Sequence, residues 1–151
     1  ADSSTSTILY MDYNYDTKDR FFTPYYDVFF YYFRHGGYAS FEFSAKVWTT
    51  QQQGTVAFWE LLKPGSPRFY TGSVEEKDNA INNLGYPGAT VVAWIYGSPD
   101  PICSSVPFFH LFNNVTGDHY YTTSTTNRDS YINSGGYIYI GITGYVLPYT
   151  P

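Results

Sequence analysis

Three stretches of this chain align with one another without a gap: residues 7–49, 55–97 and 106–148. The matched sets are Tyr10, Phe58 and Phe109; Phe22-Thr23, Tyr70-Thr71 and Tyr121-Thr122; Gly37-Tyr38, Gly85-Tyr86 and Gly136-Tyr137; and Val47, Ile95 and Val146. Roughly 40 residues is the usual length of one supersecondary repeat, and such repeats share a core because none buries one alone. We therefore expect a single domain, residues 1–151, built from three copies.

Each copy is expected to contain two strands, a short helix and two further strands. Alternating and aromatic segments predict the first two strands, and Ser73 and Ser124 are placed to cap helices that a Gly then ends. The closing segments 38–49, 86–97 and 137–148 alternate like a hairpin of two strands. The first copy carries the aromatic run "DVFFYYF" at its helix, so we expect that helix to be deeply buried or packed against a neighbour.

The expected fold class is mainly β with three short helices, since aromatic residues make up 22% of the chain and favour strands. Three copies around one core predict a pseudo-threefold single domain. A β-trefoil-like barrel is the first choice, and a three-bladed propeller-like arrangement with helices on the rim is the alternative.

Charge and hydropathy exclude some partners. The net charge is −5 and the basic residues are scattered, so nucleic acid is not expected, and no apolar run is long enough for membrane insertion. No metal or other cofactor is expected, because His35, His110 and His119 fall at different repeat positions. Cys103 is alone, and the sequence leaves open whether it is buried or links two chains, as in a homodimer.

One polar position recurs in every copy. Arg20, Arg68 and His119 align, and the residues before them are Asp19, Pro67 and Asp118. Arginine cannot act as a general base, so the shared property is planar hydrogen-bond donation rather than catalysis. Two interpretations stay open: each donor ties a turn to the next unit, or each binds hydroxyl or carboxylate oxygens of a ligand.

The third copy resembles a known family through Gly117, Asp118, His119, Tyr120, Tyr121, Thr122, Gly136, Tyr137, Gly141 and Tyr145. This is a repeat family of secreted bacterial and fungal proteins with a Gly-Asp-His-Phe/Tyr-Tyr-Thr motif and no known function. The first two copies match it only at the aromatic, Thr, Gly-Tyr and closing positions. The resemblance implies a secreted, extracellular binding module and no particular activity.

Carbohydrate binding is the function that the residues favour. Sugar sites pair flat aromatic rings with a few planar hydrogen-bonding groups, and several weak sites on one body gain avidity for a polymeric glycan. We expect a secreted lectin or cell-wall-binding module with up to three shallow sites. The predicted ligand-binding residues are Asp19, Arg20, Trp48, Arg68, Trp94, Asp118, His119 and Tyr145. Trp48 is one residue out of register with Trp94 and Tyr145, so at least one of these positions is expected in the core.

Two other functions remain alternatives to carbohydrate binding. A secreted structural or defence protein that binds another protein is the main alternative. A glycoside hydrolase is less favoured, because no pair of carboxylates recurs at a matched position, so no catalytic residue is predicted. Asn114 begins an Asn-Val-Thr sequon in a turn-like segment and is a predicted glycosylation site.

Overall fold

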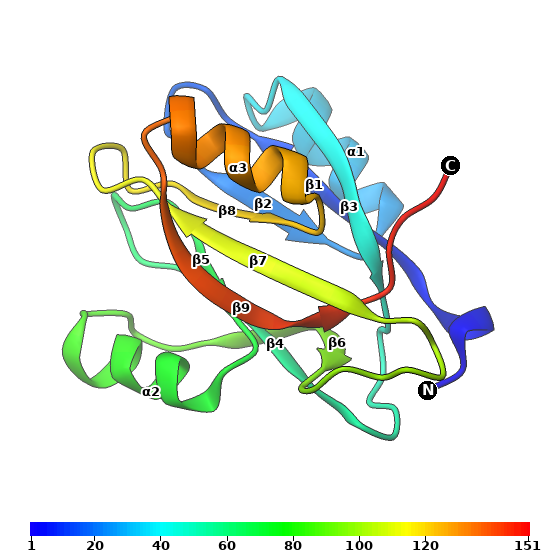
Figure 1. Ribbon diagram of the computed structural model, residues 1–151. Helices are drawn as coiled ribbons and strands as arrows, with labels where there is room; N and C mark the ends of the chain where they lie inside the picture. Colours follow the sequence, from blue (N-terminus) through cyan, green and yellow to red (C-terminus); the bar gives the residue numbers. More distant parts are fainter.

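The computed structural model describes all 151 residues as a mainly β domain with three helices (Figure 1). After a short 3-10 turn, η1 (Ser3–Thr5), the order strand, strand, helix, strand occurs three times. The first unit contains β1 (Thr7–Tyr13), β2 (Arg20–Thr23), α1 (Tyr26–His35) and β3 (Ser40–Val47). The second contains β4 (Thr55–Leu61), β5 (Phe69–Thr71), α2 (Val74–Asn83) and β6 (Thr90–Tyr96). The third contains β7 (Val106–Phe112), β8 (His119–Thr122), α3 (Thr125–Ser134) and β9 (Ile138–Val146).

Strand pairing is the same in each unit. The first strand is central, and the second and last strands pair with it antiparallel on either side. The first unit forms a three-stranded sheet of its own, in the order β2-β1-β3. The other two units join into a six-stranded sheet through one residue pair between β6 and β9, Tyr96 with Tyr145. Both sheets are open.

The expected closing hairpin is wrong: each unit ends in one strand. In β9 the register against β7 shifts twice, so that Ile140 and Thr143 are extra residues at bulges. A bulged strand carries the same alternation and the same glycines as a hairpin, so the sequence pattern does not separate the two. The bulges redirect side chains, and Thr143 accepts a hydrogen bond at Oγ1 from the backbone N–H of Gly72 in the second unit at 3.0 Å.

The repeated Thr and Gly positions have local structural roles. The hydroxyls of Thr23, Thr71 and Thr122 each accept from the backbone N–H two residues later, at the start of the helix. Ser73 and Ser124 cap α2 and α3 as predicted, accepting from Glu76 and Asn127. The helix-ending glycines Gly37, Gly85 and Gly136 have φ of 76° to 82°, a left-handed conformation that other residues rarely adopt.

The gap-free alignment is one residue out of register in β4. Phe22, Tyr70 and Tyr121 lie opposite Met11, Glu60 and His110 respectively. Glu60 is therefore the counterpart of Met11, and Leu61 that of Asp12. With this shift the bulge in the first strand of each unit also falls at the same position, after Leu9, Phe58 and Phe108.

The main core lies where the three units meet. The rings of Phe22, Tyr70 and Tyr121 contact one another at centroid distances of 5.0 to 6.0 Å. The two tyrosine hydroxyls join neighbouring units. The hydroxyl of Tyr121 donates to the backbone carbonyl of Tyr70, and the hydroxyl of Tyr70 accepts from the backbone N–H of Phe22 at 3.0 Å. Each unit thus depends on its neighbours for burial and for hydrogen bonds.

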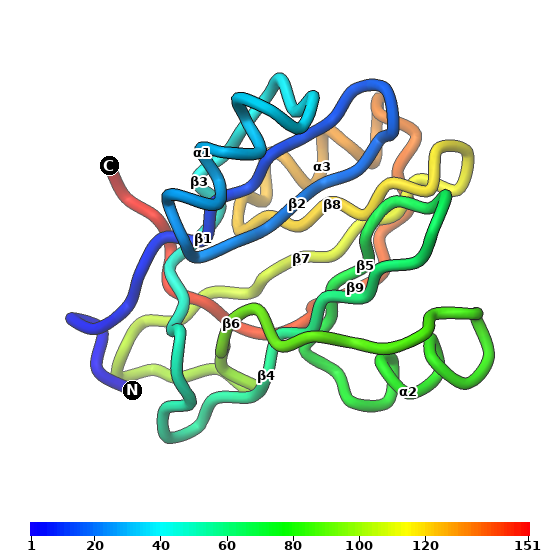
Figure 2. The backbone as a smooth tube through the Cα atoms, turned by 180° about the vertical axis from the view of Figure 1, so that it is seen from behind, coloured from blue at the N-terminus to red at the C-terminus, as the bar shows by residue number.

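The helices lie on the outside of the molecule. Figures 1 and 2 show α2 standing apart at the lower edge, whereas α1 and α3 are both at the upper edge, α3 nearer the viewer in Figure 1 and α1 nearer in Figure 2. The expected deep burial of the first helix is wrong, because Phe29 alone is buried in α1, whereas Tyr26, Phe30 and Tyr31 are exposed. None of the helices is long and apolar enough to span a membrane.

Candidate functional site

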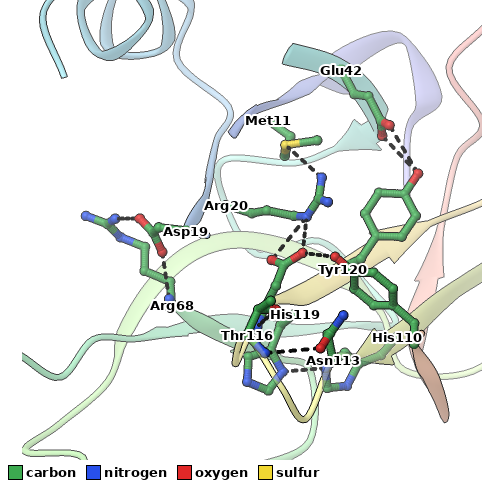
Figure 3. Close-up of polar contacts among 12 residues, drawn as sticks. Met11, Asp19, Arg20, Glu42, Arg68, His110, Asn113, Thr116, His119 and Tyr120 are labelled. Carbon is green, nitrogen blue, oxygen red and sulfur yellow. Dashed lines mark hydrogen bonds and ion pairs between the residues drawn. The ribbon is translucent and has the colours of Figure 1, made fainter. Parts of the chain in front are cut away.

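The Arg20, Arg68 and His119 column lies at the interfaces between units, not on an open surface. Arg68 of the second unit forms an ion pair with Asp19 of the first. The carboxylate of Asp19 also accepts from the backbone N–H of Arg68 at 2.7 Å. Arg20 of the first unit pairs with Asp118 of the third, Nε to Oδ2 at 3.0 Å. Figure 3 shows both arginines pointing toward the neighbouring unit. The column therefore ties units together, as the architectural interpretation expected.

A tyrosine completes each of these two ion pairs. Tyr38 donates to Asp19 at 2.5 Å, and Tyr137, its counterpart in the third unit, donates to Asp118. Both tyrosines follow the glycine that ends the helix, which explains the repeated Gly-Tyr. Asp118 is 0% and Arg20 5% exposed, so a ligand cannot reach that pair without opening the interface.

Each donor also packs on an aromatic ring of the adjoining unit. The guanidinium of Arg20 lies 4.5 Å from the ring centroid of Tyr120, and that of Arg68 lies 4.9 Å from Phe21. His119 repeats the arrangement with Phe69, ring centroid to ring centroid 5.0 Å. The contacts are thus cyclic. The donor of the second unit packs on a ring of the first, that of the first on a ring of the third, and that of the third on a ring of the second.

The third of these interfaces lacks the acid. Pro67 stands at the position of Asp19 and Asp118, and Lys63 stands where Asn14 and Asn113 fold the turn in the other units. The hydroxyl of Tyr86, the counterpart of Tyr38 and Tyr137, consequently makes no hydrogen bond with the protein, whereas its backbone N–H donates to the carbonyl of Ala80. The ring of Tyr86 lies 4.6 Å from Nζ of Lys63.

Two histidines meet at this interface. Nε2 of His110 lies 2.9 Å from Nδ1 of His119, as Figure 3 shows. Burial lowers the pKa of His119 to about 4, and burial together with His119 holds the pKa of His110 well below its usual range. The pair is therefore neutral at pH 7. In the tautomer in which His110 donates, His119 carries its own proton on Nε2 and offers it to a ligand.

Sequence reasoning missed His110 as a partner of His119. The signal was available in the predicted hairpin of β7 and β8, where Tyr121 lies opposite His110 and Phe112 opposite His119. Diagonal neighbours in an antiparallel pair share a face, so the two rings meet. The comparison of repeat positions did not reveal the contact between His110 and His119, because an alignment compares copies and says nothing about contacts within one copy.

A hollow of about 460 Å³ opens at this incomplete interface, and we call it the 2–3 hollow. Its wall contains rings and apolar side chains together with a few polar groups. The residues that line it are Lys63, Ser66, Pro67, Phe69, Glu76, Leu84, Tyr86, His110, Phe112, Gly117, His119 and Ile140. Ile140 is the extra residue at the β9 bulge, so the departure from regular strand geometry places a side chain in this wall.

A second hollow of about 730 Å³ lies between the first and second units. Asp19, Tyr38 and Arg68 line it, so it is more polar than the 2–3 hollow. Lys63 and Ser66 belong to both hollows, which therefore flank the turn between β4 and β5. Arg68, Asp19 and Tyr38 bond one another there, so these three side chains are already engaged.

The aromatic residues predicted as ligand-binding lie away from the 2–3 hollow. Trp48 is 1% exposed, and its indole N–H donates to the carbonyl of Asp2 at 2.9 Å, so it belongs to the core. Trp94 pairs with it through the backbone, and Tyr145 packs against the same small cluster. The expectation that at least one of these three is core is confirmed. Of the predicted binding residues, His119 alone lines the 2–3 hollow.

Several polar residues outside the two hollows are engaged by the protein or exposed. Glu60 accepts from Tyr70 at 2.7 Å, and Glu42 accepts from Tyr120 at 3.1 Å. No group of three His, Cys, Asp or Glu side chains is placed to hold a metal ion. Cys103 is a free, half-buried thiol that donates to the carbonyl of Ala1 at 3.1 Å. Asn114 is exposed in the turn between β7 and β8, and its glycosylation stays a prediction.

Comparison with known proteins bears on the family of the chain. No curated protein and no solved structure matches the chain significantly. One family description, "Domain of unknown function (DUF5648)", matches residues 8–147, which is nearly the whole chain. The chain therefore belongs to this family of domains of unknown function.

Proposed function

We propose that this protein is a carbohydrate-binding protein whose principal site is the 2–3 hollow. The observation that carries the proposal is the missing acid at Pro67: the other two interfaces hold an ion pair completed by a tyrosine, whereas this one leaves the hydroxyl of Tyr86 unpaired beside a hollow. Phe69, Tyr86 and Phe112 offer ring surfaces to the apolar face of a sugar. His119, Lys63 and the hydroxyl of Tyr86 offer donors to its oxygens.

The number of sites in this proposal is smaller than the three expected from repetition. Arg20 with Asp118 and Arg68 with Asp19 satisfy one another, so their groups are not free for a ligand. The neutral side chains of His119 and Tyr86 at the third interface supply directed hydrogen bonds at low desolvation cost, which suits sugar hydroxyls. One principal site therefore replaces three equivalent ones.

Two further parts of the proposal concern architecture and location. We favour the propeller-like arrangement of three units about a pseudo-threefold axis over the trefoil. The recurring strand order and the meeting of Phe22, Tyr70 and Tyr121 support it. An extracellular location, and glycans or wall polysaccharide as partners, follow from the family resemblance of the third unit and agree with the sequon at Asn114.

Binding of the labelled protein to a broad glycan array tests the function. Phe112→Ala removes a ring from the hollow and is expected to abolish binding. Phe30→Ala removes an exposed ring on α1 and serves as the matched control, which should bind like the unchanged protein. Thermal melts establish that both variants are folded. A blank array for the unchanged protein contradicts the proposal, and equal binding by Phe112→Ala places the site elsewhere.

Association with another protein is the second candidate, favoured by the aromatic surface of α1. Tyr26 and Phe30 stack at a centroid distance of 6.0 Å, and both are about half exposed, as are Tyr25 and Tyr31. Single exposed apolar residues are ordinary, but a contiguous group commonly marks a contact surface. A second copy of the chain is the partner we test, as described in the Discussion.

A further inference from the structure

Two interfaces show how this fold holds a carboxylate. The carboxylate of Asp19 accepts from the hydroxyl of Tyr38 and from the side chain of Arg68. The carboxylate of Asp118 accepts from the hydroxyl of Tyr137, and Nε of Arg20 contacts its two oxygens at 3.0 and 3.2 Å. In both cases the acid and the tyrosine come from one unit and the cation from the adjoining unit.

The third interface keeps the tyrosine, has the neutral donor His119 in place of the arginine, and lacks the acid. Tyr86 occupies the tyrosine position and His119 the donor position, and both line the 2–3 hollow. Pro67 occupies the acid position and also lines the hollow, so the carboxylate of the other interfaces has no counterpart there. The unpaired hydroxyl of Tyr86 is the consequence of that single replacement.

From this comparison we propose that the 2–3 hollow takes a glycan carrying a carboxylate, and that this carboxylate occupies the position filled by Asp19 and Asp118 at the other interfaces. The chemical class is a uronic-acid-containing oligosaccharide. The ligand would supply what the second unit lacks, with Tyr86 and His119 as donors. This inference rests on the proposed glycan-binding function and narrows it to acidic sugars.

The lining holds one cation, Lys63, and one carboxylate, Glu76, and the cation is the one that faces Tyr86. Lys63 replaces the neutral Asn14 and Asn113 of the other units, and its Nζ lies over the ring of Tyr86. Nζ spends one of its three donors on the carbonyl of Leu84 at 2.8 Å, which leaves two for a ligand. Glu76 is the acid in the lining, and its Oε1 is already bonded to the hydroxyl of Thr71 at 2.7 Å.

Calorimetric titration with a matched pair of ligands tests the inference. One ligand is a glucuronic-acid-containing oligosaccharide, and the other is the same oligosaccharide with its carboxyl groups reduced to alcohols. We expect the reduced ligand to bind at least about tenfold more weakly, because charge-assisted hydrogen bonds are lost. Equal affinity for the two ligands overturns the inference. If neither ligand binds, this inference is also overturned, and the glycan array decides separately whether the glycan-binding function stands.

Two substitutions test the position of the carboxylate. Pro67→Asp restores the acid of the other units and is expected to abolish binding of the acidic ligand. Pro67→Asn introduces a side chain of the same size as aspartate but without its charge, so it separates the effect of charge from the loss of proline. Tyr86→Phe is expected to reduce the preference for the acidic over the reduced ligand by several-fold, leaving the reduced ligand's affinity nearly unchanged. Equal binding by Pro67→Asp and Pro67→Asn, in folded proteins, contradicts the proposed position.

Discussion

At the scale of single residues, Asp12 departs most clearly from what the fold requires. The corresponding positions in the other units are Leu61 and Leu111, both buried in apolar surroundings. Asp12 is equally buried, and neither of its carboxylate oxygens has a hydrogen-bond partner. Burial raises the pKa of this carboxyl to about 7. The folded protein therefore holds a proton at Asp12 that the unfolded chain releases above about pH 4.

This difference makes stability depend on pH in a definite direction. The favourable contribution of protonated Asp12 is complete below about pH 4, and it is lost as pH rises toward 7. Asp12→Asn removes the titration, so we expect the variant to be more stable than the unchanged protein at pH 8, by roughly 1–3 kcal/mol. Urea unfolding at pH 4, 6 and 8 measures it. A stability difference that stays constant with pH would contradict the assignment.

At the scale of elements, the sequence predicted most of each unit. Local sequence signals predicted the first two strands, the Ser caps of the second and third helices, and the Gly that ends each helix. These features could be predicted because contacts between neighbouring residues produce them. The single closing strand could not be read, because a bulge at Ile140 and a hairpin turn give the same pattern of apolar residues and glycine. The exposure of α1 was also missed, since aromatic content alone does not say which face meets the core.

The exposed face of α1 leads to a prediction about association. Phe30 is 43% exposed and contacts Tyr26 and the guanidinium of Arg34. Phe30→Ser is expected to change the free energy of unfolding by less than about 0.5 kcal/mol. If α1 joins two copies, the same change should turn dimer into monomer in sedimentation velocity over a range of concentrations. Phe29→Ser, at the buried neighbour, should instead unfold the protein. An unchanged protein that is monomeric at every concentration contradicts this role of α1.

At the scale of the whole molecule, three contacts join the units in a cycle: the buried ion pair of Arg20 and Asp118, the half-buried ion pair of Arg68 and Asp19, and the packing of His119 on Phe69. Sequence alignment identified the equivalent positions Arg20, Arg68 and His119. It could not say that each arginine faces the acid of an adjoining unit, because a single chain's repeats show equivalence and not contact. The loss of Asp at Pro67 was visible in the sequence, but its meaning depended on knowing that Tyr86 and His119 lie beside it.

The ion pair between the first and third units gives a test at this scale. Arg20→Met leaves the carboxylate of Asp118 buried without its cation, and we expect a loss of about 3–5 kcal/mol in the free energy of unfolding. The double variant with Asp118→Asn removes both charges and keeps an acceptor for Tyr137, so it should recover most of that loss. Denaturant unfolding of the single and double variants decides the matter. A double variant as unstable as Arg20→Met would show that packing, not charge, holds this interface.

The two edges of β3 give the molecule one further property. Val47 pairs with Thr7 on one edge, and Lys46 pairs with Leu147 on the other. Thr7, at the start of β1, and Leu147, just after β9, therefore lie on either side of β3, about two strand spacings or 10 Å apart. A short linker can span that distance, so a circular permutant that begins at residue 55 and ends after β3 would keep every strand pair of the native chain.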